Sequence, residues 1–342
     1  MKRAVRPATP ADAAAIVALF AEVGLHPNVD PQHLHWKYWQ PRTDRPGPRS
    51  FVLASGSELL AHAATIPGTW AWGTREIPIT HVIDWAARRG ELGAGVALMK
   101  HIGQQAGALL AIGGSVATLG ILPHIGFRPA GTATDYVRPL FPLRMLRGVA
   151  NPTWRLGPRF ARSVCWKLAA PRSHGAEWQA RRLANDEADH IAAVLPRASE
   201  GMAVTGRNLE LFRYMLSCPI VPMTLFAVER AGRAGGYFLL ASTPGQVRIA
   251  DCWMESNEPR DWRAMILCAV EQAKHDPQAA EVVIRANDPL LAGALAASGF
   301  HPRNQTAIQL RAADAMPAGL LRVQMLDNDA AYFHEGRNEY WA

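Results

Sequence analysis

The sequence repeats itself once, and this repeat constrains the fold more strongly than any other feature. Four short strings of the first half return in the same order in the second half, each about 175 residues later. The pairs are VRPATPADAAAI with RRLANDEADHI, HWKYWQP with LFRYMLSCP, FVLASGSELLAH with FAVERAGRAGGY, and IGFRP with SGFHP. Because order and spacing are both kept, the sequence predicts an internal duplication, with two copies of one domain in tandem.

A basic linker is expected between the two copies. We place the first copy at residues 1–138, the linker at 139–175 and the second copy at 176–342. The linker region contains many arginines and prolines but no Asp or Glu, and Trp154 and Trp166 stand among them. Two interpretations stay open. Either short helices pack these aromatics against the domains, or the linker docks peripherally on a membrane or an anionic polymer.

Composition limits the remaining classes. A chain of 342 residues with 49% hydrophobic and 19% charged residues is globular and has room for two domains. It lacks an apolar run of about 20 residues, so no transmembrane helix is expected, and its N-terminus does not resemble a signal peptide. Four cysteines without CxxC spacing predict neither a metal site nor a disulfide framework, and therefore a cytoplasmic protein. The net charge of +7 favours anionic partners, including phosphorylated cofactors.

The stretch from Ile77 to Gly107 combines a strand, a glycine turn and a helix. IPITHVIDWAA is rich in β-branched residues, and VALMKHIGQQAG places its apolar residues on one helical face. The turn RRGELGAG lies between them. The first N–H groups of a helix have no intrahelical partner, and the helix dipole adds positive potential there. This arrangement therefore predicts an anion-binding turn, with a plain tight connection as the alternative.

Two common phosphate-binding motifs do not fit this turn. A Walker A loop needs Lys followed by Ser or Thr after its glycines, where Val96 and Ala97 stand. A dinucleotide fingerprint that starts at Gly93 needs a third glycine at position 98, which is Leu98. The phosphate that the turn would hold therefore belongs to another cofactor class.

The first copy is expected to run β-α-α-β-β-β-α-β-α-β. Two of its strands, Ser50–Ser55 and Glu58–Ile66, read as a hairpin around Gly56-Ser57. The element order, the opening R-P-A-T-x-x-D, the glycine turn and the G-F-R-P close resemble the GNAT (GCN5-related N-acetyltransferase) family. The HWKYW helix resembles a bacterial GNAT subgroup often found beside envelope-glycan genes. The resemblance implies an α/β (α+β) fold, in which each copy has a mixed central sheet flanked by helices.

The resemblance also implies the cofactor. In this family an R/Q-x-x-G-x-G/A turn wraps the pyrophosphate of acyl-CoA, here as acetyl-CoA. The residues that match or border the motif are Arg88, Arg89, Gly90, Gly93, Ala94 and Gly95. Arg89 stands one residue earlier than the family pattern expects. A constant offset places the counterparts of the last two glycines at Leu267–Cys268 and Val270, where no glycine occurs, so the second copy is expected to have lost the cofactor.

Aminolysis of a thioester needs a free amine, a site for the developing oxyanion and often an acid for the thiolate. The resemblance implies that backbone N–H groups between Ile83 and Trp85 contact the acyl carbonyl. His81 and Asp84 are the candidate bases, but strand alternation puts them on opposite faces unless the strand bulges. His81 has the more suitable pKa, although a strand histidine is also commonly a packed residue.

The family's thiolate acid is missing. A tyrosine usually stands four residues before the glycine of the closing G-F, but Leu122 and Leu295 occupy that place in the two copies. His124 is the candidate replacement, with a role as a helix-end residue as the alternative.

Other polar and aromatic residues have two interpretations each. Trp36, Tyr38 and Trp39 either pack or line an acceptor groove, and Asp251 and Glu255 are either solvated strand-end carboxylates or contacts for an amine. We therefore expect an N-acyltransferase that moves an acyl group, acetyl by preference, from CoA to a small amine or amino sugar by direct attack. The alternative is a non-catalytic duplicated protein that binds an anionic or envelope partner, with nucleic acid disfavoured.

Overall fold

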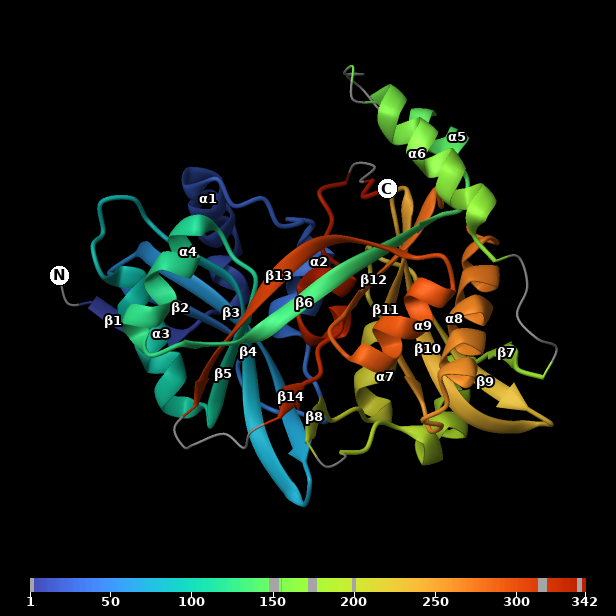
Figure 1. The fold of residues 1–342 in the computed structure, drawn as a ribbon. Coiled ribbons are helices and arrows are strands. Elements are labelled where there is room, and N and C mark those ends of the chain that lie inside the picture. The colour runs from blue at the N-terminus through green and yellow to red at the C-terminus, as the bar shows by residue number, and fades with distance from the viewer. Residues whose placement is uncertain are drawn as a thin grey trace. The chain divides into compact units, whose positions relative to one another are not determined.

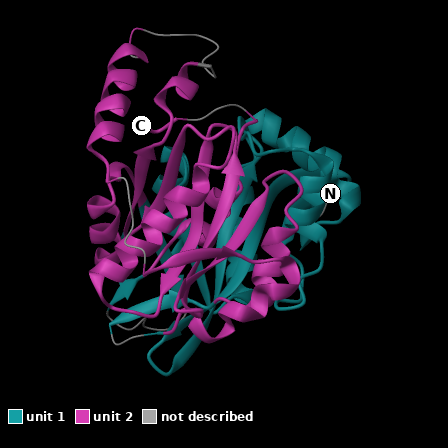
Figure 2. Cartoon of the chain, turned by 90° about the vertical axis from the view of Figure 1, so that its right-hand side faces the viewer, with its two compact units in different colours: residues 1–131, 198–206, 307–321 teal, residues 132–197, 207–306, 322–342 magenta. Residues whose placement is uncertain are grey.

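The computed structural model describes residues 3–147, 154, 156–171, 177–198, 201–312, 319–336 and 340–342. These residues form two compact units (Figure 2). Unit 1 contains residues 1–131, 198–206 and 307–321, and unit 2 contains residues 132–197, 207–306 and 322–342. Each unit therefore includes segments from both halves of the chain. The sequence boundaries at 138 and 175 stay a prediction about the duplicated segments.

The first half of the chain has the expected element order (Figure 1). The strands are β1 (Arg3–Pro7), β2 (Ser50–Ser55), β3 (Glu58–Trp72), β4 (Arg75–Ala87), β5 (Ala108–Ile112) and β6 (Arg128–Pro139). The helices are η1 (Pro10–Asp12), α1 (Ala13–Val23), α2 (Pro31–Leu34), the π-helical turn η2 (His35–Trp39), α3 (Ala94–Gln105), α4 (Val116–Ile121) and η3 (Leu122–Ile125). The hairpin between β2 and β3 closes at Gly56-Ser57 as predicted, because Ser55 pairs with Glu58.

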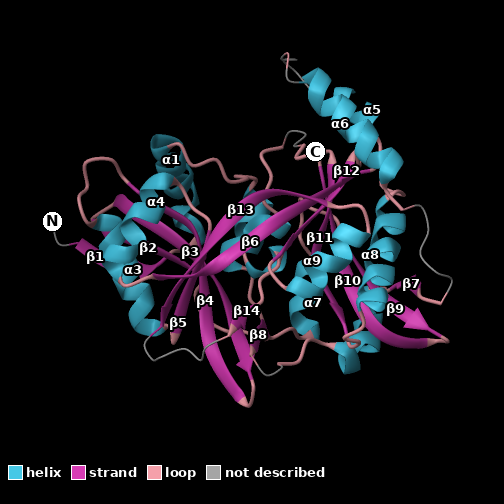
Figure 3. Ribbon diagram, in the orientation of Figure 1, coloured by secondary structure: helices cyan, strands magenta, loops and turns pink. Residues whose placement is uncertain are grey.

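Unit 1 has a mixed sheet in the order β1-β2-β3-β4-β5, in which β4 and β5 are parallel and the other neighbours antiparallel. The end of β13 (His301–Ala312) pairs with β5, and the short strands β8 (Met202–Thr205) and β14 (Leu320–Leu321) complete the unit. Strand alternation divides β2 between two cores. Phe51 and Leu53 pack with α3, whereas Val52 and Ala54 pack with α1. Helices therefore cover both faces of the sheet (Figure 3).

Unit 2 also contains a mixed series of strands. Its strands are β7 (Gln179–Arg182), β9 (Met223–Arg230), β10 (Arg233–Thr243), β11 (Gln246–Met254) and β12 (Glu281–Ala286), in that order, with β11 and β12 parallel. Thr134–Pro139 of β6 pairs antiparallel with β12. The helices are α5 (Pro142–Arg147), α6 (Leu156–Ala169), η4 (Asn185–Val194), α7 (Leu209–Leu216), α8 (Pro259–Ala273), α9 (Pro289–Ala297), η5 (Met325–Asp327) and η6 (Asp329–Ala331).

Apolar residues of α8 and α9 form the main core of unit 2 with β10, β11 and β12. The predicted linker supplies α5 and α6. Trp166 of α6 stacks on His301 with ring centroids 3.9 Å apart, which agrees with the packing interpretation, whereas the side chain of Trp154 is 79% exposed. None of the described helices is long and apolar enough to cross a membrane.

Candidate active site

Strands β4 and β5 of unit 1 separate partway along their length. Their pairing joins Ile79, Thr80 and His81 to residues 108–110, and it stops there. Farther along β4, Ile83 pairs with Ala64, and Ala86 pairs with His62. The two residues between Ile83 and Ala86 on β4 therefore oppose a single residue, Ala63, on β3. One of the two is Asp84, whose φ of +48° is unusual for a residue other than glycine. This irregularity is a β-bulge. Strand alternation would put His81 and Asp84 on opposite faces of the sheet, and a bulge is the feature that could bring them to one face.

A buried ion pair anchors the bulge. The Nζ of Lys37 lies 2.5 Å from Oδ2 of Asp84, and both side chains are less than 5% exposed. The hydroxyl of Tyr38 donates to the same oxygen at 2.7 Å. Burial raises the pKa of Asp84, but the charge of Lys37 and the hydrogen bonds from Lys37 and Tyr38 outweigh it, so the pKa lies below its ordinary value. Asp84 is therefore a carboxylate whose charge is already compensated.

His62 holds the backbone of the same residue. Its Nδ1 lies 3.0 Å from the carbonyl oxygen of Asp84, and its Nε2 lies 2.9 Å from Oγ of Ser50. The ring is completely buried, and burial lowers the pKa of His62 to about 4. The neutral imidazole can donate from Nδ1 to this carbonyl and accept from the Ser50 hydroxyl. Side chains from η2, β2 and β3 thus fix both the side chain and the backbone of Asp84.

The glycine turn after β4 leads into α3 as predicted. Gly90 and Gly93 have φ values of +84° and +78°, so both adopt the left-handed conformation that favours glycine. A Cβ atom on either would meet no atom within 4 Å, so the space above the turn is open. Gly95 has a different role, because its Cβ would lie 3.1 Å from both Cβ of Ala87 and Nε1 of Trp85. The third glycine allows α3 to pack closely on β4.

Backbone donors at the start of α3 suit an anion. Ala94 N donates back to the Glu91 carbonyl, and Ala97 N begins the helical pattern by donating to the Gly93 carbonyl. The N–H groups of Gly95 and Val96, which lie between them, belong to the first turn, where a helix leaves donors without intrahelical acceptors. The turn can therefore offer N–H groups and a positive helix end to a phosphate.

The two arginines before the turn differ. Arg88 forms ion pairs with Glu22, at 3.2 Å, and with Glu58, so carboxylates of unit 1 already neutralise it. Arg89 is exposed. Glu91, an acidic residue within the turn, is paired with Arg3 at 2.7 Å. Of the two predicted cofactor arginines, Arg89 is thus better suited to meet a phosphate.

The predicted catalytic histidines lie in different surroundings. His81 is 2% exposed and opposes Ile66 on β3. His124 is exposed on η3, whereas Leu122 of the same turn is buried in the core that contains α3. The leucine at the position where the sequence resemblance leads us to expect a tyrosine is therefore a core residue. Among the described residues, no cluster of three His, Cys, Asp or Glu side chains could hold a metal ion.

Two expectations for the second copy need correction. Asp251 is buried and ion-paired with Arg207, so its interpretation as a solvated carboxylate is wrong, whereas Glu255 is exposed. Residues 255–258 connect β11 to α8. A constant offset had placed the counterpart of the glycine turn inside α8. That placement is wrong because β10 and β11 are shorter than β3 and β4. This connection also lacks glycine.

Lys37, Ser50 and His62 were missed as members of the site. The one available signal was a lysine in the middle of HWKYW, because a cation among aromatic residues that pack must find a buried partner. Trp36 and Tyr38 are both 2% exposed, and Trp39 donates its indole N–H to the Ala8 carbonyl at 3.0 Å, so all three pack.

Neither a protein-family model nor a curated protein sequence matches this chain. Solved structures do. The chain is similar to a GCN5-related N-acetyltransferase from Anabaena variabilis, with a TM-score of 0.60 and 13% identity over 92% of this chain and 73% of that chain. It is similar to Saccharomyces cerevisiae N-myristoyltransferase with bound myristoyl-CoA, with a TM-score of 0.61 and 14% identity over 93% of this chain and 80% of that chain. These likenesses show that the chain has the mixed α/β fold of both groups of enzymes.

Proposed function

We propose that the chain is an acyl-CoA-dependent N-acyltransferase whose cofactor site lies in unit 1. One observation carries the proposal: two parallel strands separate at a bulge, and the bulged strand leads directly into an open glycine turn at a helix N-terminus. This arrangement places a backbone edge and an anion site in succession along one strand. The same fold occurs in an N-acetyltransferase and an N-myristoyltransferase, which supports the reaction class.

The residues of the turn fit the pyrophosphate of CoA. Open space above Gly90 and Gly93 leaves room for the phosphates, and the N–H groups of Gly95 and Val96 provide donors beside the exposed Arg89. We assign Ala94 to the same turn. When bound, acyl-CoA supplies a thioester whose carbonyl carbon an amine attacks directly. The C–N bond forms as the C–S bond breaks, and the amine proton leaves through a base.

We propose that the bulge stabilises the oxyanion. A bulge frees backbone groups from the ladder, so N–H groups between Ile83 and Trp85 become available to the acyl oxygen. We assign Asp84 to positioning rather than to proton transfer, because Lys37 and Tyr38 already bind its Oδ2. His81 remains the proposed base on this strand, and His124 or water the proposed acid for the thiolate.

Acetyl transfer to a small amine or amino sugar is the finer proposal. Its support is the resemblance of the turn and of the HWKYW helix to bacterial GNAT sequences. All four cysteines are free, which suits a reducing cytoplasm. The basic linker keeps two proposed roles, packing and peripheral membrane contact.

The duplication gains support from the order of the strands in the two units. Unit 1 runs β1-β2-β3-β4-β5 and unit 2 runs β7-β9-β10-β11-β12, and in each only the last pair of strands is parallel. The fourth strand of each series has a register shift. We therefore propose that unit 2 descends from a second copy that has kept the strand order but not the glycine turn.

The proposal is tested by calorimetric titration with acetyl-CoA, myristoyl-CoA and free CoA, followed by a mass-spectrometric search for N-acylated products in a panel of amines and amino sugars. We expect acyl-CoA binding and at least one acylated amine. A failure of all three cofactors to bind would overturn the proposal. Binding without turnover on any amine would favour the non-catalytic alternative, for which the core position of Leu122 is the specific observation.

A further inference from the structure

The two parallel strands of unit 2 also separate. Pairing between β11 and β12 covers residues 246–249 and 281–284 and then stops. At this point Ile249 pairs with Leu240 and Asp251 with Leu239, so Ala250 is an extra residue in β11. The second half of β11 therefore presents a backbone edge that β12 does not pair. An unpaired strand edge is a template for an extended, amide-containing partner.

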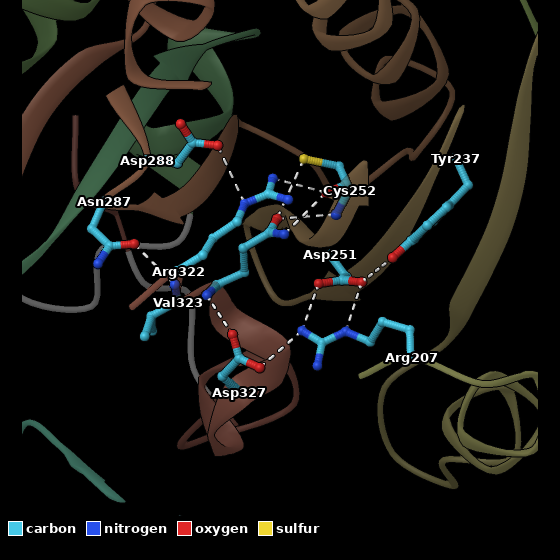
Figure 4. A network of polar contacts seen from close by, with 10 residues as sticks. Arg207, Tyr237, Asp251, Cys252, Asn287, Asp288, Arg322, Val323 and Asp327 are labelled. Carbon is cyan, nitrogen blue, oxygen red and sulfur yellow. Dashed lines mark hydrogen bonds and ion pairs between the residues drawn. The ribbon is translucent and has the colours of Figure 1, made fainter. Parts of the chain in front are cut away.

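A side chain of the same unit occupies this edge. The carboxamide of Gln324 donates from Nε2 to the Cys252 carbonyl at 3.0 Å, and its Oε1 accepts from the Cys252 N–H at 3.0 Å. The same Oε1 lies 3.3 Å from Sγ of Cys252. Figure 4 labels Cys252 and marks its polar contacts with dashed lines. A single amide thus satisfies both backbone groups of one strand residue, as a neighbouring strand or a bound amide would.

Neighbouring contacts hold the segment that carries this amide. Arg322 donates to the Cys252 carbonyl at 3.2 Å and lies 3.4 Å from Asp288, just after β12. Val323 N donates to Oδ1 of Asn287 at 2.9 Å. The segment therefore reaches from β11 to the residues that follow β12 and closes the gap between the two strands.

A buried charge network fastens the other end. Gln324 N donates to Asp327 at 2.7 Å, and Arg207 joins Asp327, at 2.9 Å, to Asp251 of β11, at 2.8 Å (Figure 4). Arg207 and both carboxylates have side chains no more than 4% exposed. Lifting the segment would break the buried Arg207–Asp327 ion pair, while Asp251 would stay paired with Arg207.

We propose that the gap between β11 and β12 is an amide-binding site, and that its occupant is the segment Arg322–Asp327 of the same chain. Gln324 takes the place that an amide of an extended ligand would take. The segment therefore excludes such ligands from unit 2, in addition to the missing glycine turn. The inference does not depend on the acyl-transfer proposal, because it rests on contacts within unit 2.

Alkylation of thiols in the native protein tests the proposal. Cys165 is exposed, whereas Cys252 and Cys268 are both buried in unit 2, and Cys268 contacts the Trp178 carbonyl rather than Gln324. After brief treatment with iodoacetamide, peptide mass spectrometry gives the rate at each cysteine. In the wild type we expect Cys165 to react and Cys252 and Cys268 to stay protected. Equal reactivity of Cys252 and Cys165 would overturn the proposal.

The variant Arg322→Ala, Gln324→Ala should release the segment. We expect alkylation of Cys252 to rise by about tenfold or more while Cys268 stays protected, because opening is then local. Release also removes the burial that raises the pKa of the Cys252 thiol, which acts in the same direction. Continued protection of Cys252, or an equal rise at Cys268, would contradict the proposal.

The variant Gln246→Ala is the matched control. Gln246 is a buried glutamine on β11, the strand that also contains Cys252, but its side chain binds Glu281 and not Cys252. We expect no change at Cys252 in this control. Should the double variant fail to fold, Gln324→Glu alone keeps the volume but places a carboxylate against the Cys252 carbonyl, and the same rise is expected. An unchanged Cys252 rate in that variant would also contradict the proposal.

Discussion

Lys37 and Asp84 form a buried ion pair, with Nζ and Oδ2 2.5 Å apart, at the bulge where β4 leaves β5. The pair joins the aromatic helical turn η2 to the strand that leads into the glycine turn. Because Asp84 has a positive φ, contacts with the surrounding structure must compensate its backbone strain. The ion pair therefore connects the stability of unit 1 with the geometry of the proposed oxyanion site.

We predict that Lys37→Met destabilises the protein by about 3–5 kcal/mol, because the variant leaves the Asp84 carboxylate buried without a countercharge, with only the Tyr38 hydroxyl bonded to it. The measurement is urea unfolding near neutral pH. Arg88→Met is the control, because Arg88 forms more exposed ion pairs with Glu22 and Glu58 and should cost about 1 kcal/mol or less. Adding Asp84→Asn to Lys37→Met should recover part of the loss. A loss with Lys37→Met no larger than that of the control would show that the pair contributes little.

His62 should make stability depend on pH. Its folded pKa of about 4 lies below the unfolded value of about 6.5, so between these values the unfolded chain binds more protons. Stability should therefore fall as the pH drops from about 6.5 to 4, by up to about 3 kcal/mol from this residue. In His62→Gln the free energy of unfolding should vary less over this range. An unchanged pH profile in the variant would contradict the assignment.

Glu281 should make stability fall as the pH rises, in the direction opposite to the effect of His62. Burial raises its pKa to about 7, against the lowering effect of hydrogen bonds from Trp341 N, Gln246 and Ala342 N. Between about pH 4.5 and 7 the folded state binds more protons, so the stability from Glu281 is lost as the pH rises through 7. We predict that Glu281→Gln is less sensitive to rising pH in this range than the wild type. The difference between the two unfolding free energies across pH 5 to 8 is the measurement, and a constant difference would contradict the prediction.

Gly95 should tolerate no side chain. Because its Cβ would lie 3.1 Å from Ala87 and Trp85, Gly95→Ala should push α3 from β4 and cost about 1–3 kcal/mol. Gly120→Ala is the matched control, since Gly120 lies in α4 with no atom within 4 Å of the added methyl group. That control should be neutral or stabilising by up to about 1 kcal/mol. Thermal unfolding of both variants measures the difference, and equal melting temperatures would contradict the close packing of α3.

The sequence predicted the elements of the first half of the chain well, because the signals there are local. Strand alternation, the Gly56-Ser57 hairpin and the glycine turn each depend on neighbouring residues, and all three occur in the structure. The partner of Lys37 could not be predicted, because Asp84 is distant in sequence and reaches it through a bulge. Asp251 was misjudged for the same reason, since Arg207 and Asp327 approach it from distant segments. A fixed repeat offset also failed where the two units have strands of different length.

The central claim is that the glycine turn of unit 1 binds the phosphates of acyl-CoA. Calorimetric titration of acetyl-CoA into Gly93→Glu and Gly73→Glu tests it most directly. Both glycines have positive φ and open space at Cβ, so the backbone strain is matched, but only Gly93 lies at the N-terminus of α3. We predict wild-type affinity for Gly73→Glu and a loss of about tenfold or more for Gly93→Glu, because a carboxylate then faces the phosphates. Equal affinity in the two variants, or no binding by the wild type, would contradict the account.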